Sequence, residues 1–121
     1  MYIKLNQPAF DKAKAMIKRG FEVGTDAKNR EAVKPSTDEK LNYLKNHTLE
    51  EYGLWFLGIN TDLPDNDQNK YTYPYGDFNL VQEGALIEIK EMATKSLDNQ
   101  IIEAVNKLLE ILYDQKKLNK T

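Results

Sequence analysis

An aromatic segment near the middle of the chain has residue types that could bind or transform a ligand. Three tyrosines fall within five positions, with a lysine before them and an aspartate after the turn: Lys70, Tyr71, Tyr73, Tyr75 and Asp77. Exposed rings can stack on nucleic-acid bases, and rings that exclude water from a carboxylate raise its pKa, as acid–base catalysis requires. These five residues are the predicted binding residues.

Charge opposes a nucleic-acid role for this segment. Asp62, Asp65 and Asp67 precede it closely in the chain and would repel phosphates. The whole chain has 17 basic and 19 acidic residues, a net charge of -2, which provides no bulk attraction to nucleic acid. Packing of these tyrosine rings around Trp55 and Phe56 in the core is a simpler explanation for the aromatic segment. Binding of single-stranded nucleic acid through the aromatic strand is therefore kept as an alternative.

Recognisable catalytic motifs are missing from the sequence. There is no cysteine, and the single histidine, His47, precedes a predicted helix start where it fits a surface position. No Gly-x-Ser-x-Gly elbow, phosphate-binding loop or dinucleotide fingerprint occurs. Asp77 follows a glycine, so we expect it to accept backbone hydrogen bonds in a turn. We predict no catalytic residue and no cofactor, with an enzyme pocket at the tyrosine–aspartate corner as a second alternative.

The acidic loop over residues 60–69 partly matches a calcium-binding loop. Asp65, Asp67 and Asn69 occupy its first, third and fifth places. However, Lys70 stands where glycine should make the bend, and Gly76 stands where a bidentate glutamate should complete the ligands. We therefore predict a solvated loop and no metal site.

Composition is typical of a single globular domain. The 121 residues, 40% of them hydrophobic, suffice for one core, so we predict one domain over 1–121 with a frayed tail at 116–121. The start of the chain lacks the apolar stretch of a signal peptide, and no apolar run reaches membrane-spanning length. A cytoplasmic protein without a membrane partner is the resulting expectation.

Start and stop signals divide most of the chain into helices. The predicted helices cover residues 8–19, a segment after the capping box from Ser36 to Glu39, a turn over 48–52, residues 80–95, and a final segment capped by Asp98. The residues expected to face inward are Leu41 and Leu44 in the second helix, Val81, Ala85, Ile89 and Met92 in the fourth, and Ile101, Val105, Leu108, Leu109 and Leu112 in the last.

Two segments have the pattern of strands. Residues 54–59 are short and densely apolar, and residues 71–75 alternate, so an antiparallel hairpin is predicted across the loop between them. Alternation would place the three tyrosines on one face. Phe21 and Val23 predict a further short edge strand. The predicted fold class is α+β, with four to five helices packed on this small hairpin.

A second apolar side on the later helices indicates protein association. Leu80 and Ile87 project opposite the main apolar stripe of helix 80–95, and Ile111 does so on the last helix. A helix that is apolar on two sides is either enclosed by the fold or shared with a partner. The leading hypothesis is a noncovalent protein-interaction or self-associating module, with these three residues as its interface.

The order of features also resembles a family of small bacterial proteins without an assigned activity, some of them encoded near prophage genes. The matching residues are Pro8 to Lys14, Pro35 to Thr37, Glu51 to Trp55, Leu57 to Ile59, the block Tyr73 to Phe78, and Val81, Gly84, Leu86 and Ile87. The block Tyr73 to Phe78 is the most specific part. Relatives have a His-Arg pair where this chain has Gln82-Glu83, and an arginine near its Glu91-Met92-Ala93. The resemblance implies a fold and no particular role.

Overall fold

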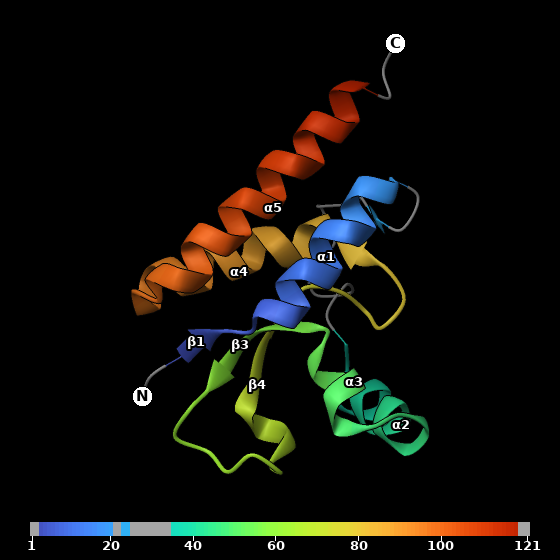
Figure 1. Ribbon diagram of the computed structural model, residues 1–121, viewed down its shortest axis with the longest axis vertical. Helices are drawn as coiled ribbons and strands as arrows, with labels where there is room; N and C mark the ends of the chain where they lie inside the picture. Colours follow the sequence, from blue (N-terminus) through green and yellow to red (C-terminus); the bar gives the residue numbers. More distant parts are fainter. Residues whose placement is uncertain (1–2, 21–22, 25–34, 119–121) are drawn as a thin grey trace.

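The computed structural model describes residues 3–20, 23–24 and 35–118, which form five helices and two small sheets (Figure 1). In chain order the elements are β1 (Ile3–Leu5), α1 (Gln7–Arg19), β2 (Val23–Gly24), α2 (Thr37–Asn46), α3 (Leu49–Gly53), β3 (Phe56–Asn60), the 3-10 helix η2 (Gln68–Lys70), β4 (Tyr71–Pro74), β5 (Val81–Gln82), α4 (Glu83–Ser96) and α5 (Asn99–Leu118). The predicted α+β class is confirmed.

The main sheet is antiparallel with the order β1–β3–β4. Pairing of Phe56 with Pro74 and of Gly58 with Thr72 confirms the predicted hairpin. Strand β1 pairs with the other side of β3 and was not predicted from the sequence. Three residues are too few to show an alternating pattern, so only tertiary pairing identifies this strand.

Both edges of this sheet discourage the addition of another strand. At β1, the Leu5 N–H donates to Oε1 of Gln100 from α5 at 2.9 Å. At β4, Tyr73 has a φ of 63°, and Pro74 has no N–H to offer. Short strands, proline and local kinks are the usual means by which proteins protect sheet edges.

A second, parallel pair of strands precedes α4. Val23 lies opposite Val81, and Gly24 lies opposite Gln82. The predicted strand near Val23 is thus confirmed, whereas Phe21 lies outside the described residues. The helix predicted from residue 80 begins only at Glu83, because Gln82 is held in strand β5 and its N–H donates to Tyr75 O at 3.0 Å.

Helices α1, α4 and α5 lie together beside the main sheet, whereas α2 and α3 lie at the opposite end (Figure 1). Helix α5 packs against both α4 and α1. Its predicted inward residues are all buried, namely Ile101, Val105, Leu108, Leu109 and Leu112. The apolar stripe of α5 therefore lines one side of the core along the length of the helix.

Two residues that were predicted to face the core are exposed instead. Leu41 is 45% exposed, because α2 directs Tyr43 inward, where its ring stacks on Phe78 at 4.5 Å. Met92 is 48% exposed, because the last buried position of α4 is taken by Ala93. Helix α2 buries none of its own residues, so it is attached at the periphery of the core.

Helix α5 extends further than predicted. It continues to Leu118, and Nζ of Lys116 lies 2.6 Å from Oε1 of Glu83, whose side chain is almost completely buried. Residues 116–118 are therefore helical rather than frayed, and residues 119–121 lie outside the described part. No helix among the described residues has the length and apolar character needed to cross a membrane.

Asn6 joins four elements at the centre of the fold. Its buried side-chain amide donates to Gly53 O at 2.9 Å and to Phe56 O at 3.1 Å. Its backbone N–H donates to Leu57 O, and its carbonyl accepts from the N–H of Phe10. One residue thus connects β1 and α1 to the end of α3 and the start of β3.

Replacing Asn6 by aspartate should destabilise the protein by about 3 kcal/mol. The substitution keeps the shape but directs a carboxylate, which only accepts hydrogen bonds when ionised, at two carbonyl oxygens. Urea unfolding at pH 7 measures the loss. The matched control is Asn106→Asp at an exposed position of α5, which should stay within about 0.5 kcal/mol of the parent protein. Equal losses in both variants would contradict this role of Asn6.

Candidate functional site

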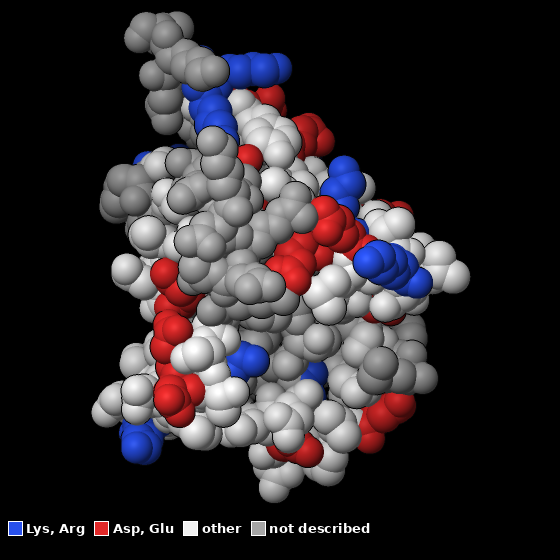
Figure 2. All heavy atoms as spheres, turned by 180° about the vertical axis from the view of Figure 1, so that it is seen from behind, with Lys and Arg blue, Asp and Glu red and all other residues white. Residues whose placement is uncertain are grey.

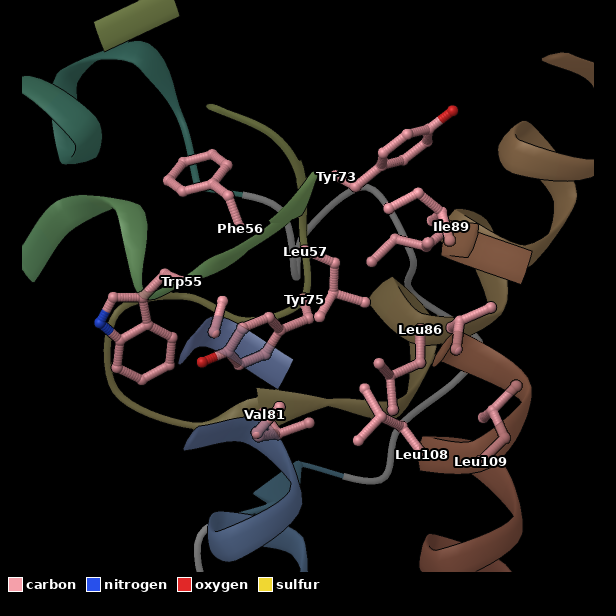
Figure 3. Packing of buried hydrophobic residues seen from close by; sticks show 14 of the residues in the cluster. Trp55, Phe56, Leu57, Tyr73, Tyr75, Val81, Leu86, Ile89, Leu108 and Leu109 are labelled. Atoms are coloured by element: carbon pink, nitrogen blue, oxygen red, sulfur yellow. The ribbon is translucent and has the colours of Figure 1, made fainter. Parts of the chain in front are cut away.

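The five predicted binding residues do not form one surface. Figure 3 shows Tyr73 and Tyr75 pointing in different directions, Tyr73 toward the side of Ile89 and Tyr75 toward Trp55. The φ of 63° at Tyr73 interrupts the strand geometry on which strict alternation depends. The prediction of a single aromatic face is therefore wrong.

Tyr75 belongs to the core. It is completely buried, and its ring stacks on Trp55 with 5.6 Å between centroids. Its hydroxyl donates to Leu54 O at 2.6 Å. Burial raises the pKa of Tyr75 well above its usual value, so the ring stays neutral. Its environment is that of a structural residue.

Tyr73 connects the main sheet to the start of α5. Its ring is buried, and its hydroxyl donates to Oδ2 of Asp98, the residue before α5, at 2.5 Å. Burial, and then the hydrogen bond to Asp98, raise the pKa of Tyr73 to about 12. The side chain therefore acts as a neutral donor that orients the junction between α4 and α5.

Tyr71 and Lys70 border the acidic loop. Nζ of Lys70 lies 5.0 Å from the centre of the Tyr71 ring and 2.5 Å from Asp65 O. The Asp67 carboxylate accepts the N–H of Asn69 at 2.9 Å. Among the described residues, no group of three or more histidine or acidic side chains could hold a metal ion. The loop groups thus bond to one another.

Asp77 accepts three hydrogen bonds inside the turn. One carboxylate oxygen accepts the N–H groups of Asn79 at 3.1 Å and Leu80 at 2.8 Å, and the other accepts from Nε2 of Gln82 at 3.1 Å. The expected turn role of Asp77 is confirmed. These partners account for Asp77 without an acid–base function.

Phe78, which follows Asp77, is the centre of the aromatic cluster. With a φ of 66°, its ring reaches Tyr43 of α2 at 4.5 Å and Tyr52 of α3 at 5.7 Å between centroids. It also contacts the rings of Trp55 at 6.0 Å and Phe56 at 6.2 Å. The aromatic segment thus holds the two peripheral helices on the sheet.

The predicted interface residues are partly enclosed by the fold. Ile87 and Ile111 are half-buried against the core, and Leu80 is half-buried in the turn. Helix α4 contacts α5, β4 and β5, which accounts for apolar residues on two of its sides. These three residues therefore present less free apolar surface than the sequence pattern indicates.

A different group of residues forms a hollow of about 200 Å³ between β4 and α4. Tyr73 and Pro74 of β4 form one wall, Ile89 and Met92 of α4 form the other, and Lys40 of α2 and Glu88 of α4 add charge to the lining. Most of the lining is apolar. We call this feature the β4–α4 hollow. Sequence reasoning missed it because Met92 fits the apolar stripe of a core helix.

Leu97 is the most exposed large apolar residue of the described chain. It follows α4 with a φ of 58° and a ψ of 34° and is 77% exposed. The N–H groups of Leu97 and Asp98 bond back to Thr94 O and Ala93 O, as in helix ends that usually carry glycine. Leu97 is next to Asp98, which holds Tyr73 in the wall of the β4–α4 hollow.

Comparisons of the chain with protein-family models, curated proteins and solved structures find no match. The resemblance to small bacterial proteins accordingly stays a prediction.

The stability of this protein should fall as the pH rises from 10 to 12, and Tyr73 should contribute to that loss. The unfolded chain releases tyrosine protons near pH 10, whereas folding holds the pKa of Tyr73 at about 12. Its contribution is thus fully present below pH 10 and is lost as the pH approaches 12. Urea unfolding at several alkaline pH values measures it. Tyr73→Phe should give a shallower decline, and an unchanged decline would contradict the burial of this hydroxyl.

Replacing Leu97 by glycine should stabilise the protein by about 1 kcal/mol. Glycine adopts the left-handed conformation without the steric cost of a Cβ atom, and the leucine side chain buries little surface to lose. Leu97→Ala is the matched control, because alanine keeps the Cβ cost. Chemical denaturation compares the two, and a glycine variant no more stable than the alanine variant would exclude strain at this position.

Proposed function

We propose that this protein is a noncovalent protein-binding module that accepts an apolar side chain of a partner in the β4–α4 hollow. The observation that carries the proposal is Met92, an apolar side chain that is 48% exposed at the lining of a mostly apolar hollow. Together with the mostly apolar lining of the hollow, its exposed side chain provides a contiguous apolar surface that a partner's side chain can cover.

The size of the hollow favours a side chain over a small-molecule ligand. Sites for drug-sized ligands enclose roughly 300–1,000 Å³, whereas this one encloses about 200 Å³. That volume suits one or two apolar side chains. Burying one such anchor contributes about 2 kcal/mol, which is the scale of the residues that dominate protein interfaces.

Leu97 is a second exposed apolar residue, next in the chain to the Asp98 that bonds to Tyr73 of the hollow. A leucine in the left-handed region costs roughly 1 kcal/mol or more, and this one leaves most of its apolar surface in water. Strain retained at an exposed position is a reason to infer function. Contact with a partner that also fills the β4–α4 hollow would explain why glycine is not used there.

Nucleic-acid binding is less well supported by the arrangement of rings and charges. Tyr75 is completely buried and Tyr73 nearly so, which leaves Tyr71 as the most accessible of the three rings. On the face in Figure 2, several acidic side chains gather along the left edge, whereas the basic side chains are scattered. Among the described residues, the two buried tyrosine rings provide no stacking platform, and the face in Figure 2 shows no basic track.

Selection from a random peptide library displayed on phage tests the proposal, because it requires no identified partner. We expect selected peptides to share an apolar anchor residue. Met92→Lys should weaken their binding by about tenfold or more, because it places a charge at the lining of the β4–α4 hollow. Fluorescence anisotropy with the selected peptides measures the change.

The matched control is Tyr113→Lys, which replaces another exposed apolar residue, 42% exposed on α5, by the same charged group. It should leave peptide affinity unchanged. If the selected peptides bind both variants as well as the parent protein, or if no peptide is enriched, the β4–α4 hollow is not a protein-binding site.

A further inference from the structure

The outward side of α2 is a second surface, separate from the β4–α4 hollow. Four exposed residues, Asp38, Leu41, Asn42 and Lys45, have the spacing of one helical face and are defined as the outer face of α2. The opposite side carries Tyr43, whose ring stacks on Phe78. The fold therefore uses one side of α2 and leaves the outer face to solvent.

An apolar residue lies at the centre of the outer face. Leu41 is 45% exposed and, with neighbouring α2 residues and Gln68 of η2, lines a shallow depression of about 460 Å³. The two ends of the face have opposite charges, from Asp38 at the start and Lys45 near the end. Neither Asp38 nor Lys45 forms an ion pair with another described residue.

This order of charges is self-complementary. Asp38 and Lys45 are equally far from the point between Leu41 and Asn42, about 5 Å along the helix axis on either side. If a second helix of the same sequence packs antiparallel at that point, Asp38 of each copy lies level with Lys45 of the other. Two equal contacts of this kind define a two-fold axis.

We propose that a second copy of this chain binds here, with α2 packed antiparallel against α2 of its partner. The two Leu41 side chains meet near the two-fold axis and exclude water from each other. The two Asp38–Lys45 contacts flank them and set the antiparallel orientation, since a parallel pair would place like charges together. The opposed helix dipoles favour the same orientation.

The small outer face predicts a weak dimer. A standard stable interface buries about 800 Å² on each partner, and a face of four side chains on a ten-residue helix provides much less. We therefore expect a dissociation constant on the order of 100 µM. The inference goes beyond partner binding at the β4–α4 hollow, because it uses a different surface and a different occupant.

Charge reversal with mixing tests the dimer. Sedimentation velocity of the parent protein should show a mass that rises with concentration from that of the 14.0 kDa chain toward twice that value. Asp38→Lys alone and Lys45→Asp alone should each weaken association by about tenfold, because each homodimer then opposes like charges twice. An equimolar mixture of the two variants should associate at least as tightly as the parent protein.

The mixing experiment distinguishes loss of the Asp38–Lys45 contact from unfolding of α2, because an unfolded α2 would not restore association when the two variants are mixed. Asp114→Lys, an exposed residue on α5 with the same change in net charge, is the control and should not weaken association. A parent protein that stays monomeric at about 1 mM overturns the dimer. Association that is insensitive to the single reversals, or that the mixture does not restore, overturns this interface while leaving peptide binding at the β4–α4 hollow to its own test.

Discussion

The left-handed backbone at Tyr73 and Phe78 directs the rings of these two residues toward separate parts of the fold. This conformation costs roughly 1–2 kcal/mol of conformational free energy at each of the two residues. In this conformation Tyr73 reaches the start of α5, and Phe78 reaches four rings on α2, on α3, on β3 and in the turn between α3 and β3. Aromatic contacts of this kind contribute about 0.5–1.5 kcal/mol each beyond the surface that they bury. One short segment therefore contacts α2, α3 and the start of α5 at once.

The same constraint explains where free apolar surface remains. Since Tyr73 turns toward α5, its ring, although buried in the core cluster, also forms a wall of the β4–α4 hollow. Since Phe78 holds α2 through Tyr43, the opposite side of that helix stays in water. The two proposed surfaces are thus consequences of how the aromatic segment distributes its rings. Helix α2 contributes to both, with Lys40 at the β4–α4 hollow and Leu41 on its outer face.

Hydrogen bonds of buried polar side chains also fix the positions of the elements. The buried amide of Asn6 supplies hydrogen atoms to two carbonyl oxygens where α3 gives way to β3. Asp77 supports the turn that leads into β5, and Gln82 bonds to it from that strand. Gln82 and Glu83 are both buried, and Glu83 is paired to Lys116 from the end of α5. Buried polar side chains need such partners.

Local signals in the sequence determined the helices, because capping boxes at Ser36 and Thr48 and the apolar stripe of α5 act over a few residues. They also determined the hairpin, since two apolar segments flank a polar loop. Only the tertiary structure decided the third strand, β1, which has too few residues for a pattern and exists through its pairing with β3. It also decided which tyrosines are buried and that Met92 and Leu41 are exposed. The directions of the Tyr73 and Phe78 rings depend on the positive φ of these residues, which contacts between distant residues stabilise and local sequence does not specify.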